Sequence, residues 1–396
     1  MAHNQHLLAN QEIPGNESDS AKMRIGVASL EYNRTQGIER SSAEIADRLA
    51  AWGHEVHFHC ASSNDTGSTR VRFHRVHTLD IVNSTRISSF AVLGSRDVRN
   101  AGYQITHSHG LAVGCDVITA HSCHRAGMEV RRKIRPARLQ SRNLGVADRI
   151  RLFIEYQNFG RRRYKNIIAV AEGVRRELSA YYGIPDDDVV VIPNGVDLHE
   201  FAPDESGVSR RAVRRELHLE DEDTVILFVG NEFDRKGLEY VIEALHVLHD
   251  LSVRLVVAGN DDISPYLKKA DALGVKQQVV HLGRCREISR YYKACDLFCL
   301  PTEYEAFSLA TLEAAACGLP LLVTKVNGTE ELVTDGENGY FISRDGERIA
   351  EAIRSLLHDH GRMKRMGLNA HRSAQSYGWD EIARRVLAVY EGVLAR

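Results

Sequence analysis

The chain has 396 residues, which at about 100–200 residues per domain predicts two or three domains. Its apolar content of 43% is ample for packed cores. The formal net charge of −2 excludes an overall positive electrostatic potential of the kind that attracts nucleic acid. Because the chain has neither a signal peptide nor an apolar run near about 18 residues, we expect a cytoplasmic protein. The polar residues 1–22 are expected to form a disordered tail.

Seven cysteines are scattered along the chain and form no C-x-x-C pair. Most lie in apolar strand or helix contexts, a pattern that favours reduced, buried thiols over a zinc site. We therefore expect no metal.

The first part of the chain alternates strands and helices. An apolar strand at 23–29, a loop ending at Gly37, a helix to about Trp52 and an alternating strand at 55–60 make a βαβ unit. No G-x-G-x-x-G is present, so a nicotinamide fingerprint is absent, and Gly37 either lets the backbone approach a ligand or caps the loop. Further strands are predicted at 70–76, 104–108, 115–119, 166–170 and 189–192.

A histidine follows the strand predicted at 115–119. Because parallel sheets bind ligands at the carboxyl ends of their strands, His121 is a candidate site residue. His107, His109 and His124 are competitors nearby, and a structural hydrogen-bonding role is the alternative for all four.

Residues 131–165 form a basic region, with twelve lysines and arginines against Asp148 and Glu155. It is either a patch for an anionic acceptor or anionic membrane surface, or a pair of solvated helices. Its apolar side chains fit either reading, because they could contact a membrane surface or pack against the protein core. They are Leu152, Phe153, Ile154, Tyr156 and Phe159.

A second βα series follows the turn signal P-N-G, and we place the domains at 23–198 and 199–378. A strand is predicted at 224–230, followed by a helix to about His249 that begins at Arg235 and Lys236. The helix dipole destabilises each cation there by about 0.3–1 kcal/mol. An anion held between the two cations and the helix would make their electrostatic energy favourable. The alternative is that both side chains point to water.

The strand–loop–helix–strand unit at 296–324 is the segment that says most about function. Its helix, predicted at 308–317, has free N–H groups at its start that can hold a phosphate without a side chain. These amides belong to Phe307, Ser308 and Leu309. Glu305 and Glu313 would flank the anion and accept hydrogen bonds from neutral hydroxyls beside it, such as those of a ribose and a sugar. The alternative is a buried helix with one capping and one solvated glutamate.

The stretch E-A-F-S-L-A-T-L-E, followed by A-A-A-C-G-L-P, resembles the signature of retaining glycosyltransferases of family 4, which have the GT-B fold. The resemblance covers about 23–396. It implies an α/β fold of two doubly wound, Rossmann-like domains facing a central cleft, with the acceptor on the first and a nucleotide sugar on the second. It also implies that the amphipathic helix at 379–396 braces the first domain. Ala306 and Ser308 replace frequent glycines, which is expected to narrow the pocket beside the sugar.

The same resemblance implies the roles of the charged residues. Glu305 contacts the donor sugar and Glu313 the ribose, while Arg235 and Lys236 contact the diphosphate. These cations and the helix N-terminus then stabilise the leaving group, the role that a metal has in other transferases. No D-x-D-like carboxylate pair lies in a suitable loop, so metal independence is expected. Same-face attack, with the leaving phosphate helping to deprotonate the acceptor, needs no nucleophilic side chain.

Three further positions are implied less directly. His121 matches a histidine close to the reacting sugar. Gly37 matches one of two adjacent glycines near the donor phosphates, the other being Gln36 here. Arg284 lies in the loop 283–286, where the family reads the base. The segment G-N-E-F-D-R-K-G, with Asn231 where many members have arginine, looks like the lipopolysaccharide-core glucosyltransferase branch.

We therefore expect a metal-independent retaining hexosyltransferase that takes a nucleoside diphosphate sugar, UDP-sugar favoured, and a glycan, glycolipid or small-molecule acceptor. It would serve polysaccharide or lipopolysaccharide biosynthesis, with 131–165 as a peripheral contact with anionic membrane and with no nucleic-acid partner. One alternative is a sugar-nucleotide 2-epimerase, which needs acid/base residues around the sugar and no acceptor. The other is a non-catalytic anion- or RNA-binding protein, although the basic region lacks the motifs of an RNA module.

Overall fold

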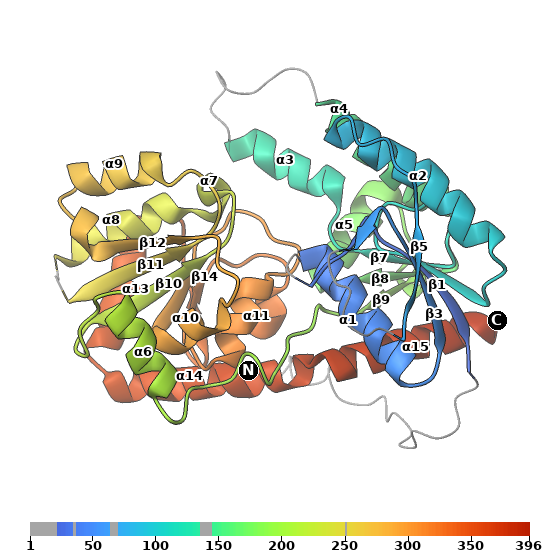
Figure 1. Ribbon diagram of the computed structural model, residues 1–396. Helices are drawn as coiled ribbons and strands as arrows, with labels where there is room; N and C mark the ends of the chain where they lie inside the picture. The colour runs from blue at the N-terminus through green and yellow to red at the C-terminus, as the bar shows by residue number, and fades with distance from the viewer. Residues whose placement is uncertain (1–21, 35–36, 64–69, 135–144, 250–251) are drawn as a thin grey trace.

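The computed structural model describes residues 22–34, 37–63, 70–134, 145–249 and 252–396. Two α/β domains lie side by side, and the helices α14 (His360–Ala374) and α15 (Trp379–Leu394) run beneath them from the second domain to the first (Figure 1). The tail predicted at 1–22 falls outside the described residues except for its last residue. The prediction of two doubly wound domains is confirmed.

The first domain is built on a seven-stranded parallel sheet in the order β5–β3–β1–β6–β7–β8–β9. The strand order reverses at β1, which pairs with β3 on one side and β6 on the other. The strands are β1 (Arg24–Ala28), β3 (Glu55–Cys60), β5 (Arg72–Arg75), β6 (Ile105–Ser108), β7 (Val117–Ala120), β8 (Asn166–Ala169) and β9 (Val189–Val191). The helices are α1 (Gly37–Ala51), α2 (Asn83–Asn100), α3 (His124–Ile134), α4 (Val146–Glu155) and α5 (Glu172–Tyr182).

The second domain has a six-stranded parallel sheet in the order β12–β11–β10–β13–β14–β15. Its order reverses at β10, between β11 and β13. The strands are β10 (Thr224–Val229), β11 (Val253–Ala258), β12 (Val279–Gly283), β13 (Leu297–Leu300), β14 (Leu321–Val323) and β15 (Gly339–Phe341). The helices before α14 are α6 (Val208–Glu216), α7 (Phe233–Lys236), α8 (Leu238–Leu248), α9 (Ser264–Ala272), α10 (Ser289–Ala294), α11 (Leu309–Ala316), α12 (Thr329–Leu332) and α13 (Gly346–Leu357).

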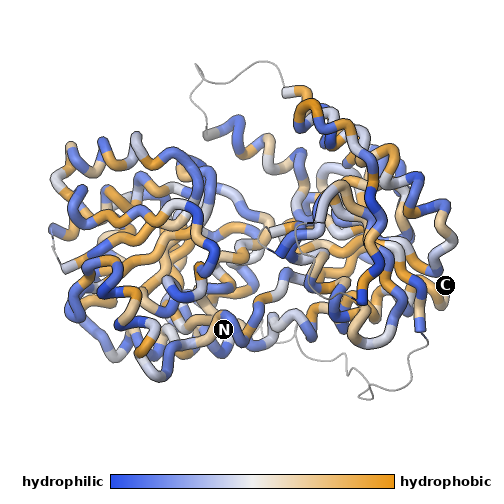
Figure 2. Tube along the Cα trace, in the orientation of Figure 1, coloured by the Kyte–Doolittle hydropathy of each residue, from blue (hydrophilic) through white to orange (hydrophobic). Residues whose placement is uncertain are grey.

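Apolar side chains fill both domains, and Figure 2 shows the hydrophobic strands enclosed by helices with hydrophilic outer stretches. Parallel strands are covered on both faces, so they carry continuous apolar runs such as T-V-I-L-F-V in β10. All seven cysteines are free thiols and six are buried. In the part of the chain that the structure describes, no helix is both long and apolar enough to cross a bilayer.

The last helix belongs to the core of the first domain. Trp379, Ile382, Val386 and Tyr390 pack into the same buried cluster as Ile25 of β1. The Tyr390 hydroxyl lies 2.6 Å from Nδ1 of the buried His107. Just before the helix, the Val196 N–H donates to the Tyr377 carbonyl at 2.8 Å. The chain therefore crosses between its domains twice, and the second crossing fastens α15 beneath the first sheet.

The helices α2 and α6 were not predicted from the sequence. The helix α2 is rich in serine and asparagine, which are poor helix formers, but it buries one face of apolar and small residues against the first sheet. The helix α6 occupies part of the stretch 199–223 that reads only as charged and strand-poor. In α2 tertiary packing outweighs intrinsic propensity, whereas α6, V-S-R-R-A-V-R-R-E, consists mainly of good helix formers.

Candidate active site

The predicted charged residues meet at the carboxyl ends of β10 and β13. These two strands are neighbours at the point where the order of the second sheet reverses, which is where open α/β sheets bind ligands. Arg235 and Lys236 follow β10, Glu305 follows β13, and α11 begins just beyond, at Leu309. Two segments far apart in the sequence, 235–236 and 305–309, therefore converge on one edge of the sheet.

Lys236, Arg235 and Glu305 form a compact ionic cluster. The Lys236 Nζ donates to Glu305 Oε1 at 2.7 Å, and an Arg235 Nη donates to the same oxygen at 3.2 Å. Their side chains are only 12%, 18% and 13% exposed, respectively. Burial disfavours the charged form of Glu305, but Lys236 and Arg235 outweigh it and hold the pKa of that carboxyl below its ordinary value. The cluster thus combines two cations with one ionised carboxylate.

The expected start of a helix at Arg235 and Lys236 is wrong. These residues end the one-turn helix α7, and α8 begins only after Gly237, whose φ of 77° interrupts the two. A β-carbon at residue 237 would collide with the Pro301 carbonyl, so glycine lets this loop lie directly against the end of β13. The cations therefore precede the N-cap of α8 and do not form its first turn, and they pair with Glu305.

Gly230 explains how Lys236 reaches the cluster. Gly230 ends the run of β10 with a φ of 152°, and a β-carbon there would overlap the aliphatic stem of Lys236. The lysine stem thus lies across the end of the strand, in space that only glycine leaves open.

Arg344 is a positioning residue that the sequence analysis missed. Its guanidinium donates to the Arg235 carbonyl at 2.6 Å and to the Pro301 carbonyl at 3.2 Å, and it forms an ion pair with Glu303 at 3.0 Å. It also lies over the Tyr240 ring. Arg344 therefore ties the loop after β10 to the loop after β13. It follows β15 at the same sheet edge, and the carboxyl-edge rule applied to every strand would have found it.

The start of α11 lies one residue later than predicted. Ser308 is the N-cap, with its hydroxyl accepting from the Thr311 N–H at 3.2 Å, and the first backbone bond runs from the Leu312 N–H to the Ser308 carbonyl. The amides that remain at this terminus are those of Ser308, Leu309 and Ala310. Phe307 precedes the cap, and its ring is buried in the core. The predicted helix terminus is thus shifted by one residue, and anion binding at its free amides stays a prediction.

Glu313 lies on the inner face of α11 and has partners from both domains. An Arg40 Nη from α1 donates to Oε1 at 2.9 Å, and the Tyr292 hydroxyl from α10 donates to Oε2 at 3.1 Å. Burial raises the pKa of Glu313 to about 7, against the opposing effects of Arg40 and Tyr292. Glu313 is therefore neither a capping nor a solvated residue.

The first domain approaches this edge through two of its loops. A β-carbon at Gly37 would lie 3.7 Å from the Leu309 side chain, so the loop that enters α1 contacts the start of α11. Tyr304, next to Glu305, donates from its hydroxyl to Glu177 at 3.1 Å and to the Cys123 carbonyl at 3.4 Å. The segment that follows β7 and the loop that follows β13 therefore face one another.

His121 follows β7 in that segment. Its Nε2 is hydrogen-bonded to Nδ1 of the buried His109 at 3.0 Å, and burial lowers its pKa to about 4. His107 bonds to Tyr390 and Thr119 inside the core, which supports the structural alternative for it. His124 lies 3.3 Å from Asp148 on α4. His121 is thus a neutral hydrogen-bonding group at neutral pH.

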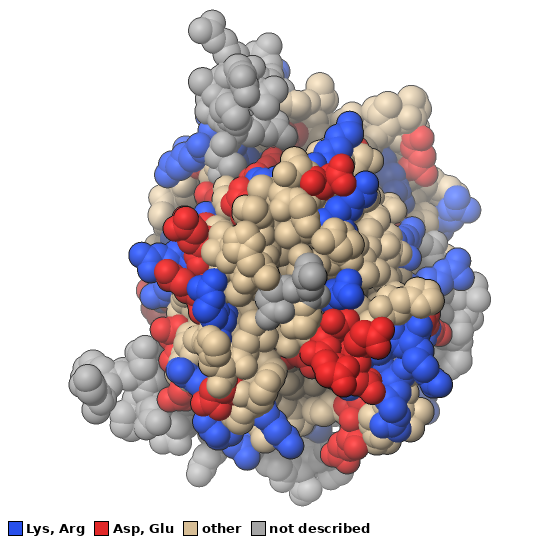
Figure 3. Space-filling view, turned by 90° about the vertical axis from the view of Figure 1, so that its left-hand side faces the viewer, with Lys and Arg blue, Asp and Glu red and all other residues tan. Residues whose placement is uncertain are grey.

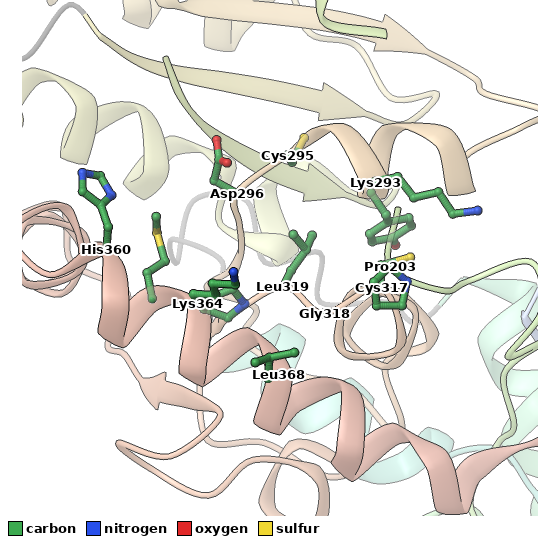
Figure 4. Close-up of a pocket in the computed structure, with 13 residues that line it drawn as sticks. Pro203, Lys293, Cys295, Asp296, Cys317, Gly318, Leu319, His360, Lys364 and Leu368 are labelled. Atoms are coloured by element: carbon green, nitrogen blue, oxygen red, sulfur yellow. The ribbon is translucent and has the colours of Figure 1, made fainter. Parts of the chain in front are cut away.

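Arg284 is exposed in the loop after the edge strand β12, and it takes no part in the hydrogen-bonded clusters around Glu305 and Glu313. The hollow in Figure 4 lies at the far end of α11 from Ser308, beside Cys317, Lys293 and Leu368. None of the predicted site residues lines it. Figure 3 shows that acidic and basic side chains intermingle on the outer end of the second domain.

The basic region forms parts of α3 and α4, and Arg135, Arg138 and Arg142 fall outside the described residues. Its apolar side chains divide between core and surface: Ile154 and Phe159 are buried, whereas Phe153 is 62% and Tyr156 50% exposed. From α3, Arg131 reaches Glu232, which also binds Arg235. The region therefore borders the charged cluster.

Comparison with known proteins settles the family. The model described as Glycosyltransferase Family 4 matches residues 35–200, and the model described as Glycosyl transferases group 1 matches residues 209–373. The chain belongs to the family 4-like glycosyltransferases of the GT-B fold. The two matches leave residues 1–34, 201–208 and 374–396 of this glycosyltransferase uncovered.

Relatives and solved structures agree with this assignment. The glycosyltransferase is 32% identical over 231 residues to an uncharacterized glycosyltransferase of Methanocaldococcus jannaschii and 33% identical over 234 residues to a D-inositol 3-phosphate glycosyltransferase of Xylanimonas cellulosilytica. Each match covers 57% of this chain, and the chain spans 59% and 56% of those relatives.

The fold resembles WaaG, a glycosyltransferase involved in lipopolysaccharide biosynthesis, with a TM-score of 0.79 at 22% identity over 93% of this chain and 100% of that one. It also resembles Anabaena HepE in complex with UDP and glucose, with a TM-score of 0.72 at 17% identity over 93% and 100% of the two chains.

Proposed function

We propose that this glycosyltransferase moves a hexose, with retention of configuration, from a nucleoside diphosphate sugar to a glycan, glycolipid or small-molecule acceptor. The observation that carries the proposal is the cluster of Lys236, Arg235 and Glu305 beside the N-terminus of α11. Two cations, a row of backbone amides and a carboxylate are what a diphosphate joined to a sugar requires. The UDP bound to HepE makes UDP-sugars the first donors to test.

The chemistry depends on charge developing at the leaving group. As the bond to the anomeric carbon breaks, the diphosphate gains negative charge, and Lys236, Arg235 and the amides of Leu309 and Ala310 stabilise it in a site with little solvent. The diphosphate takes over the cations, and Glu305 then accepts hydrogen bonds from sugar hydroxyls. Glu313 accepts from the ribose.

The acceptor attacks from the face that the diphosphate leaves, and a diphosphate oxygen takes the acceptor proton, so no side chain acts as a nucleophile. His121, neutral at physiological pH, offers a hydrogen bond to the sugar or acceptor. The leaving group is neutralised by side chains and amides, so we propose that no metal is required.

A second part of the proposal concerns location. The exposed Phe153 on α4 and Tyr156 directly after it, with the arginines around them, suit insertion at an anionic membrane surface that presents a glycolipid acceptor. Such an acceptor would place the enzyme in polysaccharide or lipopolysaccharide biosynthesis.

Product analysis tests the function. The chain is incubated with UDP-glucose or another nucleotide sugar, with and without candidate acceptors such as inositol phosphate, in the presence of EDTA. We expect an α-linked product from an α-configured donor, seen by the anomeric proton coupling, and only with acceptor. An isomerised sugar nucleotide without acceptor would identify an epimerase, and salt-sensitive anion binding without turnover would identify a non-catalytic protein. Strict dependence on added Mn²⁺ would contradict metal independence.

A further inference from the structure

Glu313 is held by a network that spans the two domains. Arg40 on α1 pairs with Glu313 at 2.9 Å and with Glu200 at 3.6 Å, and its guanidinium lies 5.5 Å from the centre of the Phe201 ring. Phe201 packs edge-on against Tyr292, whose hydroxyl returns to Glu313. Arg40 comes from the first domain, Glu200 and Phe201 from the segment that leads into the second, and Tyr292 and Glu313 from the second domain.

The hydrogen bonds leave Glu313 with defined spare capacity. An ionised carboxylate has about four acceptor sites, two on each oxygen. Arg40 uses one site on Oε1, and Tyr292, whose hydroxyl also lies 3.2 Å from the Ala310 carbonyl, uses at most one on Oε2. At least one site remains on each oxygen, which matches two neighbouring hydroxyls, such as the 2′- and 3′-hydroxyls of a ribose.

This capacity exists only while the carboxylate is charged. The titratable groups that face Glu313 are Arg40 on α1, Glu200 in the linker, Tyr292 on α10 and the buried Cys317 beyond α11. Among these Arg40 is the cation, and the side chains of the pair are only 14% and 10% exposed. Without Arg40, burial and Glu200 would both favour the protonated acid, which donates one hydrogen bond and accepts fewer.

We propose that Arg40 is a positioning residue for the donor: it favours the ionised form of Glu313 and orients the carboxylate to accept two ribose hydroxyls. The proposal rests on the ribose role of Glu313 in the proposed function. Because Arg40 and Glu313 belong to different domains, ribose recognition then requires the two domains to be docked as they are here. If the Arg40–Glu313 ion pair served only to hold the domains together, its loss would not change the preference for ribose over 2′-deoxyribose.

The test is calorimetric binding, between pH 6.5 and 9.5, of whichever of UDP, GDP and ADP binds most tightly and of the 2′-deoxy form of the same nucleotide. We expect Arg40→Met to weaken binding of the ribonucleotide at pH 8 by at least tenfold and to remove most of the preference over the deoxy analogue. We also expect its affinity to recover towards high pH, since loss of the cation raises the pKa of Glu313. Arg40→Lys keeps the charge and should restore much of the ribose preference.

Arg48→Met is the matched control. Arg48 lies two turns further along α1 and pairs with Glu44 and Asp380 rather than with the second sheet, so its loss should change neither the ribose preference nor its pH dependence. The inference would be overturned if the ribose preference and the pH dependence of Arg40→Met stayed within twofold of those of the unaltered chain. If Arg40→Met does not fold, a loss of the ribose preference in the charge-preserving Arg40→Lys would likewise overturn it. Failure of the unaltered chain to bind any nucleoside diphosphate would instead overturn the proposed function, and this inference with it.

Discussion

The ammonium of Lys236 lies 2.7 Å from the carboxylate of Glu305, although the two residues are 69 positions apart and follow different strands. β10 and β13 are hydrogen-bonded neighbours at the reversal of the second sheet, and Gly230 and Gly237 leave the space in which their loops meet. Arg235 shares the same carboxylate oxygen. In the account proposed here, the donor diphosphate takes over these cations from Glu305.

Replacing Lys236 with methionine tests the contact with the leaving group. The change keeps the apolar stem that lies against Gly230 and removes the charge, so we expect turnover to fall on the order of 10²-fold, as when an oxyanion donor is lost. Initial rates with saturating donor and acceptor measure the effect. Lys269→Met is the control, because Lys269 pairs with Glu239 and Glu243 between α8 and α9. Near-normal turnover in both Lys236→Met and Arg235→Met would remove the diphosphate assignment.

The pH dependence of donor binding tests Glu313. Its pKa is raised to about 7, so the carboxylate becomes protonated as pH falls through that value and loses acceptor sites for the ribose. We expect donor affinity to decline below about pH 7. Glu313→Gln should weaken binding and abolish this step. His121, with a pKa of about 4, is neutral on both sides of it, and so His121→Asn should keep the step. A step that survives in Glu313→Gln belongs to another group.

Asp296 and Arg214 provide a test of stability away from the chemistry. Arg214 on α6 is buried, pairs with Asp296 at 2.6 Å and donates to the Ala294 and Asp223 carbonyls. Asp296 keeps Arg210 as a second ion-pair partner at 2.6 Å, so the main loss is of the hydrogen bonds to buried carbonyls such as that of Asp223. We therefore expect Arg214→Met to lower the free energy of unfolding by about 2–4 kcal/mol. Urea unfolding followed by circular dichroism measures it. The exposed Arg348 is the control, and its replacement should cost less than about 1 kcal/mol.

Vesicle flotation tests the membrane contact. We expect recovery with anionic vesicles at low salt to exceed recovery with neutral ones, and Phe153→Ser with Tyr156→Ser to reduce it, because these exposed rings supply the apolar part of the contact. The matched change Val92→Ser alters an equally exposed apolar residue on α2. Equal recovery on the two vesicle types would rule out an anionic membrane as the partner of the basic region.

Local rules place the charged residues of the candidate site at strand ends and a helix start, and the resemblance to family 4 is what groups them into one site. Lys236 and Glu305 each follow an apolar strand, and Ser308 precedes a run of good helix formers, so strand ends and a helix start could be located without tertiary information. The pairing of Arg40 with Glu313 could not be located, since it depends on how two domains dock. The break at Gly237 was missed because only contact with Pro301 reveals that a helix cannot pass there. The helix α2 was missed because packing, and not propensity, stabilises its serine-rich sequence.

The most direct test of the central claim compares nucleotides in a thermal-shift panel. UDP, GDP, ADP and dTDP and their sugars are set against the corresponding monophosphates, with the unaltered chain at neutral pH without metal. We predict that one base stabilises the protein, by about 2.7 kcal/mol at 100 times its dissociation constant, and that its diphosphate binds at least tenfold tighter than its monophosphate. A diphosphate that stabilises no more than its monophosphate, for every base, would contradict the account.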